Sequence, residues 1–221
     1  MSISMTLKAA KQDPAEARLT SKTTGHILKR MPRPNVREQL LHAGLKTFNT
    51  LGFYGCTVQD ITQAAQVPKG SFYNHFESKE ALAMEALELF WSGGASRRAI
   101  LSDKSIDPVE RLRLHFQKLT NVLATNKFEV GCLIGNFSSE MSRHPDFQDR
   151  LARIYHDWSR AIENCIDDIT AAGRLKIQAT PKVLAAFLVS AWEGAVLRAK
   201  VERSGAAFEE FEQVTLTGFF A

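Results

Sequence analysis

The sequence predicts an all-α protein, and three observations carry this prediction. From residue 40 onward, apolar residues recur three and four positions apart, which is the spacing of one face of an α-helix. No stretch of five or more residues alternates strictly between apolar and polar, as a half-buried strand would. Helix-starting Ser, Thr or Pro and helix-stopping Gly separate the periodic segments. We therefore expect helices joined by loops, and no sheet.

The start and stop signals place the helices in chain order. The apolar spacing of residues 40–51 ends at Gly52, and Thr57 begins a second helix with Asp60 completing a capping pattern. Pro68 interrupts that helix, because proline lacks the amide that a helix interior needs, and suits the first turn of a new helix running to about Phe76. The later helices are expected over residues 79–100, 108–123, 131–141, 145–173, 181–203 and 208–219.

The longest apolar stripe lies in the helix that Pro145 opens. Its members follow at spacings of 4, 3, 4, 4, 3 and 4: Phe147, Leu151, Ile154, Trp158, Ile162, Cys165 and Ile169. This pattern places Cys165 in the core. We expect His42 and His115, by contrast, on helix surfaces.

The positive charge is concentrated at the N-terminus. The chain of 221 residues carries a formal charge of +4. Residues 1–34 hold seven Lys or Arg against two acidic residues, so +5; residues 35–80 sum to 0, and the remainder to −1. Residues 1–34 also lack apolar periodicity, which predicts a disordered basic arm on a near-neutral body.

Several protein classes are excluded by composition. The longest apolar stretch, Val183–Trp192, has ten residues, whereas a transmembrane helix needs about 20. The N-terminus lacks the apolar core of a signal peptide. Cys56, Cys132 and Cys165 are widely spaced without a Cys/His cluster, so neither disulfides nor a metal site is expected. We expect a cytoplasmic protein without a cofactor and without membrane association.

The segment from Thr57 to Leu82 carries the functional signal. It predicts a helix, a tight turn and a very short second helix. The second helix displays side chains able to form hydrogen bonds: Lys69, Ser71, Tyr73, Asn74 and His75. A short helix with a dense polar face suits the major groove of DNA, where base edges offer donors and acceptors.

The run from Gly52 to Glu80 resembles the TetR family of bacterial transcriptional regulators. The resemblance implies a homodimer with a three-helix DNA-binding domain (35–80) and a C-terminal helical domain (81–221) for effector binding and dimerisation. It makes these residues candidate DNA contacts: Thr57, Lys69, Ser71, Tyr73, Asn74, His75 and Lys79. Gln66 departs from the family pattern, which often has glycine there, and would be strained in a left-handed conformation.

The basic arm has two possible roles. Arg30 and Arg33, beside prolines, are candidates to enter the minor groove, as the arms of other helix-turn-helix proteins do. Alternatively, the arm is a solvated tail that only adds non-specific attraction.

The segment Gly131–Met141 resembles the TetR subgroup that responds to acrylate, N-ethylmaleimide and other small electrophiles, in which a cysteine follows a glycine. Cys132 is therefore the candidate sensor. It lies at a predicted helix start, where free amides stabilise a thiolate and lower its pKa. The alternative is that Cys132 is a small buried apolar residue.

An effector pocket needs a few polar groups in an apolar wall. The candidates are Asn136, Glu140, Trp192, Glu193 and Arg198. Arg198 is the candidate to hold a carboxylate, but Glu193 and Arg198 are equally compatible with the surface, and Trp192 with the core. The small residues of the helix 183–200 suit a close helix contact between two copies, or else internal packing.

Together these observations predict a repressor, not an enzyme, which a small electrophile or short-chain acid releases from double-stranded operator DNA. Three alternatives remain: a purely non-covalent sensor with an inert Cys132, a thiol-dependent enzyme, and a non-specific architectural DNA-binding protein. The enzyme alternative lacks a positioned base near Cys132 and leaves the DNA motif unexplained.

Overall fold

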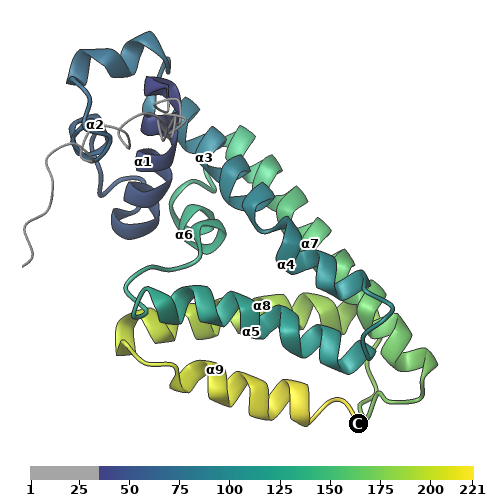
Figure 1. Ribbon diagram of the computed structural model, residues 1–221. Coiled ribbons are helices and arrows are strands. Elements are labelled where there is room, and N and C mark those ends of the chain that lie inside the picture. Colours follow the sequence, from purple (N-terminus) through teal and green to yellow (C-terminus); the bar gives the residue numbers. More distant parts are fainter. Residues whose placement is uncertain (1–34) are drawn as a thin grey trace, which may run out of the picture. The chain divides into compact units, whose positions relative to one another are not determined.

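The computed structural model describes residues 35–221, which fold into helices as predicted. The arm of residues 1–34, with Arg30 and Arg33, lies outside the described residues. Within residues 35–221, β pairing is limited to one isolated bridge between Leu175 and Phe220. The elements, shown in Figure 1, are α1 (Val36–Leu51), α2 (Val58–Ala64), η2 (Lys69–Asn74), α3 (Lys79–Gly93), α4 (Ala95–Ala99), η3 (Ile100–Ser102), α5 (Pro108–Thr125), α6 (Leu133–Glu140), α7 (Pro145–Ala171), α8 (Pro181–Glu202), α9 (Ala206–Phe211) and η4 (Glu212–Thr217).

The first elements pack around a small aromatic core. Phe48 of α1 and Phe72 of η2 are fully buried, and Phe76 is almost so. Helix α1 crosses α3 closely at Gly44, where a Cβ atom would lie 2.8 Å from Leu82 Cδ2. The short helix η2 packs against α2, and its Phe72 side chain holds it to this core.

Local sequence signals determine where α2 begins and how the chain turns after it. Thr57 and Asp60 make the expected capping box: the Thr57 side chain accepts from the Asp60 amide at 3.2 Å, and the Asp60 carboxylate accepts from the Thr57 amide at 2.7 Å. Gln66 does adopt the left-handed conformation, with φ of +57°. That conformation costs a non-glycine residue about 1–2 kcal/mol, so this turn stores some strain.

Three predicted helices differ from the structure. The segment after Pro68 is a 3₁₀ helix, η2, and not an α-helix. The helix expected over 79–100 breaks at Gly94 into α3, α4 and η3. The last helix is divided into α9 and a π-helical turn, η4. Gly94 is the cap between α3 and α4, and α4 carries Arg97 and Arg98.

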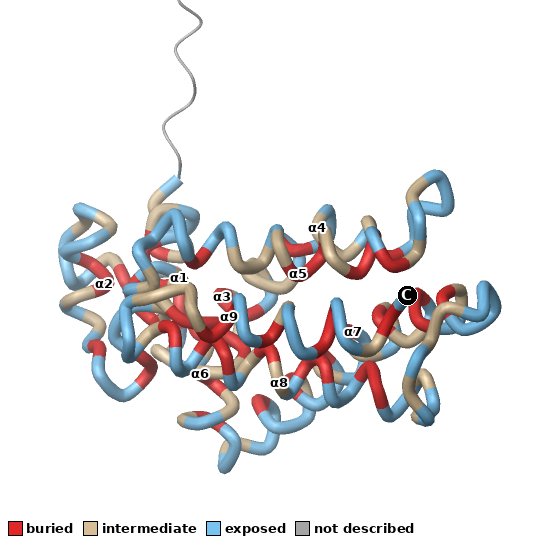
Figure 2. The backbone as a smooth tube through the Cα atoms, turned by 90° about the horizontal axis from the view of Figure 1, so that it is seen from below, coloured by how far each residue is buried: buried red, intermediate tan, exposed pale blue. Residues whose placement is uncertain are grey.

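The C-terminal body consists of α5, α7, α8 and α9, with α7 packed on α8 and α5. All seven residues of the predicted α7 stripe are buried, including Cys165. Buried segments recur along α7 and α8 in Figure 2. None of the helices in residues 35–221 is both long and apolar enough to cross a membrane.

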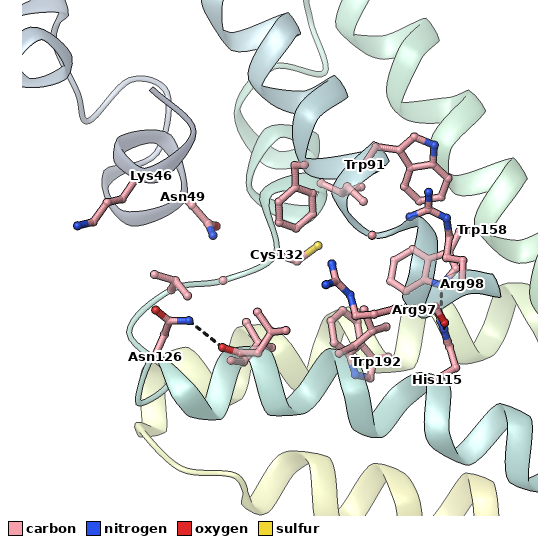
Figure 3. Close-up of a pocket in the computed structure, with 18 of the residues that line it drawn as sticks. Lys46, Asn49, Trp91, Arg97, Arg98, His115, Asn126, Cys132, Trp158 and Trp192 are labelled. Atoms are coloured by element: carbon pink, nitrogen blue, oxygen red, sulfur yellow. Dashed lines mark hydrogen bonds between the residues drawn. The ribbon is translucent and has the colours of Figure 1, made fainter. Parts of the chain in front are cut away.

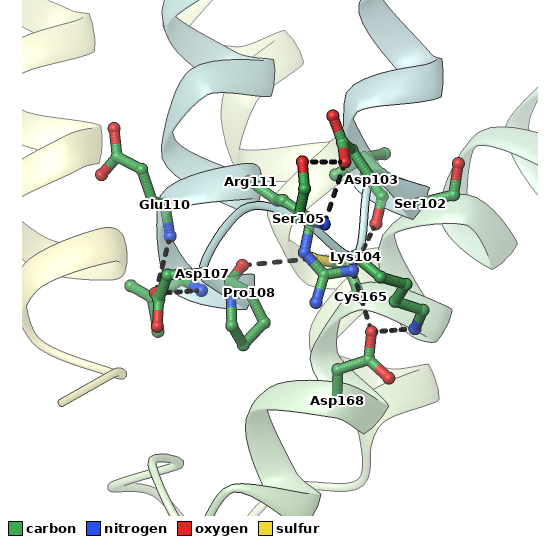
Figure 4. Close-up of polar contacts among 12 residues, drawn as sticks. Ser102, Asp103, Lys104, Ser105, Asp107, Pro108, Glu110, Arg111, Cys165 and Asp168 are labelled. Carbon is green, nitrogen blue, oxygen red and sulfur yellow. Dashed lines mark hydrogen bonds and ion pairs between the residues drawn. The ribbon is translucent and has the colours of Figure 1, made fainter.

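A buried arginine fixes the segment α4–η3 to this body (Figure 4). The Arg111 side chain is 3% exposed and donates to the Leu101 carbonyl at 3.0 Å and to Asp168 Oδ2 at 2.9 Å. Lys104 pairs with the same carboxylate, and the hydrogen bonds from Lys104 and Arg111 hold the pKa of Asp168 below its usual value. The α4–η3 segment therefore has a defined position against α5 and α7.

Candidate nucleic-acid interface and ligand cavity

The short helix η2 presents most of the predicted DNA contacts to solvent. Lys69, Tyr73 and Asn74 are exposed, and Ser71 and His75 are half-buried. The Tyr73 ring packs edge-on against buried Phe72, with ring centroids 5.2 Å apart, yet Tyr73 remains 62% exposed. The hydrophobic core thus orients η2, while its polar side chains remain available.

Two other predicted DNA contacts are engaged within the protein. The Thr57 hydroxyl donates to Asp60 Oδ2 at 2.7 Å as part of the cap, although Thr57 itself is exposed. The Lys79 ammonium donates to the carbonyls of Phe53 and Cys56, both at 2.8 Å. It also lies 4.2 Å from the centroid of the Phe53 ring. Lys79 therefore supports the α1–α2 loop, and its contact with DNA stays a prediction.

A cavity of about 200 Å³ lies among α1, the α3–α4 segment, α5 and the loop before α6. Its walls include three indoles, Trp91, Trp158 and Trp192, and the polar side chains of Lys46, Asn49, Arg97, Arg98, His115 and Cys132. Figure 3 shows Arg97 extending toward Cys132 from the opposite side of this space. The cavity therefore takes residues from both predicted domains.

His115 is part of the cavity wall, which corrects the expectation of a surface histidine. The Trp158 indole N–H donates to His115 Nε2 at 3.0 Å, so the ring proton is on Nδ1, which donates to the Arg97 carbonyl at 3.0 Å. Burial, together with the charges of Arg98 and Arg97, lowers the pKa of His115 to about 4. The imidazole is therefore neutral at physiological pH.

The two cavity arginines were missed by sequence reasoning. Arg98 stacks on Trp91, its guanidinium carbon 3.5 Å from the ring centroid. Burial, and then the charge of Arg97, lower the pKa of Arg98 below its ordinary value, against an opposing effect of Asp157. The Arg97 Nε atom is buried without a hydrogen-bond partner. Arg97 and Arg98 follow the helix break at Gly94, and no local sequence pattern predicts the orientation of their side chains.

Cys132 lines the cavity but does not have the expected thiolate character. It is the N-terminal cap of α6 and is 6% exposed. Burial, followed by the charge of Glu193, raises the pKa of its thiol well above the usual value. The amides of Gly135 and Ile134 do lower it, as expected at a helix start, but their effect is smaller. The expectation of a lowered pKa is therefore wrong.

Glu193 is the polar neighbour of Cys132. Its carboxyl group accepts a hydrogen bond from the thiol, and burial raises the pKa of Glu193 to about 7. Its Oε1 atom has no hydrogen-bond partner. Trp192, the adjacent residue, lines the cavity with its indole nitrogen buried and unpaired.

Four predicted effector residues lie outside the cavity wall, namely Glu193, described above, and Arg198, Asn136 and Glu140. Arg198 is half exposed and donates to Glu202 at 3.0 Å and Glu210 at 2.5 Å, so it is a surface residue. Asn136 donates to the Asn49 carbonyl at 3.4 Å. Glu140, at the far end of α6, accepts from the Tyr54 amide at 2.8 Å and abuts Gly52. Glu140 therefore contacts the α1–α2 loop and not a ligand.

Two family models match the chain. "Bacterial regulatory proteins, tetR family" covers residues 40–86, and "Tetracyclin repressor-like, C-terminal domain" covers residues 108–215. The chain is 41% identical to the transcriptional repressor DhaR of Mycobacterium sp. (strain GP1), across 82% of this chain and 90% of the relative. The chain belongs to the TetR family of bacterial transcriptional regulators.

Solved TetR-family structures agree with this membership. Regulatory protein TetR from Rhodobacter sphaeroides is 32% identical, with a TM-score of 0.78 over 83% of this chain and 98% of that one. The reduced form of E. coli NemR is 26% identical, with a TM-score of 0.71 over 84% and 97%. Members of the TetR family bind operator DNA as dimers and are not enzymes, and this chain is a transcriptional repressor of that family.

Proposed function

We propose that this TetR-family repressor acts in the cytoplasm as a homodimer and leaves its operator when a small effector fills the cavity. Residues 35–80 serve as the DNA-binding domain and residues 81–221 as the effector and dimerisation domain. The observation that carries the proposal is the composition of the cavity wall. Lys46, Asn49 and Thr50 of α1 face the same space as residues of α4, α5 and the loop before α6. A ligand there contacts both domains at once.

Helix α6 provides the second link between the domains. Its N-terminal cap, Cys132, lines the cavity, and its last residue, Glu140, accepts from the Tyr54 amide in the α1–α2 loop. A shift of α6 on effector binding would therefore be passed to the DNA-binding domain through a hydrogen bond. The effector releases the operator only if it binds the conformation that cannot bind DNA more tightly than the conformation that can.

Reversible binding is the effector chemistry that the geometry favours. The thiol of Cys132 is buried and its raised pKa keeps it protonated at neutral pH, whereas the thiolate is the reactive form. The covalent alternative, in which Cys132 attacks an electrophile, is supported by the position of Cys132 in the cavity wall and by the similarity to NemR, crystallised in a reduced form. In both alternatives, the reversible and the covalent one, the effector binds in the same cavity.

A gel-shift experiment on the DNA upstream of the chain's own coding sequence tests the proposal. We expect a specific shift that acrylate or propionate reverses, with the Cys132→Ser variant responding as the wild type does. Release by N-ethylmaleimide that Cys132→Ser abolishes, with a matching mass increase, would establish the covalent alternative. No release by any of the three compounds would contradict the proposed effector chemistry.

The variant Glu140→Gln tests the proposed link. Glutamine keeps an acceptor but loses the charge, which weakens the hydrogen bond to the Tyr54 amide. We expect operator affinity without effector to be retained and release to require about tenfold more effector. Effector binding to the protein alone, measured by calorimetry, should be unchanged. Release at the wild-type concentration would show that Glu140 does not couple the domains.

A further inference from the structure

The charged side chains that line the cavity are all positive. Lys46, Arg97 and Arg98 are among its lining residues, whereas no aspartate or glutamate of residues 35–221 is. Neither Arg97 nor Arg98 forms an ion pair within this part of the chain. The charge of Arg97 is instead close enough to Arg98 to disfavour the charged form of Arg98.

The rest of the wall adds no compensating charge. His115 is neutral, because both ring nitrogens are engaged and burial disfavours its protonated form. Cys132 carries a protonated thiol. Trp91, Trp158 and Trp192 supply flat apolar surface. Arg97 lines this cavity, and its Nε atom is buried without a hydrogen-bond acceptor.

We propose that the effector is a small monocarboxylate, bound with its carboxylate on Arg97 and its apolar body against the indoles. This inference rests on the proposed function and specifies the ligand class of the same cavity. A guanidinium offers two parallel N–H donors that match a carboxylate. In this proposal Arg97, which lines the cavity, takes the place of Arg198, the carboxylate partner expected from the sequence.

The size of the cavity limits the ligand. A cavity of about 150 Å³ is enough to hold benzene, and this one measures about 200 Å³. The ligand is thus a short-chain or single-ring acid. A carboxylate beside Arg97 and Arg98 also removes the mutual repulsion of the two guanidinium groups, so ligand charge contributes to affinity and not only to orientation.

Isothermal titration calorimetry on the full chain without DNA tests the inference. The probes are two matched pairs, benzoate with benzamide and butyrate with butyramide, in which only the charge differs. We expect at least one acid to bind, and its amide to bind at least about tenfold more weakly. Equal affinity of acid and amide, or no binding of either acid, would overturn the inference.

Two variants locate the carboxylate. Arg97→Gln should lower affinity for the acid at least about tenfold while leaving the weak affinity for the amide unchanged. Arg198→Gln is the matched control and should bind the acid as the wild type does. Undiminished acid binding by Arg97→Gln would overturn the assignment. Should Arg97→Gln fail to fold, judged by circular dichroism, the acid and amide pairs with the wild type still decide the ligand class.

The outcomes separate this inference from the proposed function. If a neutral or electrophilic compound releases the operator while both acids fail to bind, the repressor mechanism holds and the carboxylate inference falls. If an acid binds with the expected dependence on Arg97 but no compound releases the operator, the ligand class holds and the proposed regulation falls.

Discussion

Replacing Leu197 with aspartate is expected to convert the repressor into a monomer and to weaken operator binding by roughly a hundredfold or more. Leu197 belongs to a stripe on α8 whose members repeat at spacings of 4, 3, 4, 3 and 4: Val183, Phe187, Ser190, Gly194, Leu197 and Val201. The four large apolar side chains are 49–84% exposed. Exposed apolar side chains in one continuous line indicate an interface.

A second copy of the chain is the occupant that we propose for this stripe. The TetR family acts as dimers, and η4 carries a further exposed apolar side chain, Val214, which is 61% exposed. In a two-fold interface each Leu197→Asp substitution occurs twice, so two carboxylates would be buried without partners. Of the small α8 residues expected at the interface, Ala185, Ala195 and Ala199 instead pack internally.

Sedimentation equilibrium gives the mass of the variant, and gel shifts give its operator affinity. Ala152→Asp, at an exposed position on α7, is the matched control and should remain dimeric. A Leu197→Asp protein that sediments as a dimer and binds the operator as the wild type does would show that the stripe has another role.

The double variant Lys69→Ala, Tyr73→Ala is expected to abolish sequence-specific binding, again by roughly a hundredfold or more. Both side chains are exposed on η2, where buried Phe72 orients them. A tyrosine that meets a base edge contributes about 1–3 kcal/mol of discrimination, a lysine that meets a phosphate positions the helix, and a dimer uses each of them twice. Gel shifts with specific and scrambled DNA, at two salt concentrations, would measure the loss.

Two controls keep this result interpretable. Tyr73→Phe preserves the ring contact with Phe72 and removes only the hydroxyl, so it separates packing from recognition. Lys118→Ala removes an exposed lysine from α5, away from η2, and should leave affinity unchanged. If the double variant retains the wild-type preference for specific DNA, η2 is not the element that recognises the operator sequence.

The features that the sequence predicted correctly are those determined by neighbouring residues. The capping box of Thr57 and Asp60 needs only a spacing of three residues, and the α7 stripe only the helical period. His115 was placed wrongly although a signal existed: it lies three residues after Leu112 and four before Leu119, on the buried face of α5.

The effector site could not be read from the sequence, because it depends on distant contacts. The helix break at Gly94 and the anchoring of Arg111 decide that Arg97, and not Arg198, reaches the cavity. Burial of the Cys132 thiol, and then the charge of Glu193 from the distant helix α8, raise its pKa and outweigh the effect of the helix start. Neither the position of Arg97 nor the contact between Cys132 and Glu193 is marked by a local sequence pattern.

The contacts that hold the α1–α2 loop involve its main chain. Lys79 donates to two carbonyl groups of the loop, and Glu140 accepts from one amide. None of these hydrogen bonds uses a side chain of η2, although Phe53 and Tyr54 of the loop also contact Lys79 and His144 through their side chains. The side chains of η2 can therefore change, and with them the genes under control. The C-terminal effector domain meanwhile keeps its hydrogen bonds to the α1–α2 loop. A repressor built in this way is modular: new promoters can be adopted without redesign of the sensor.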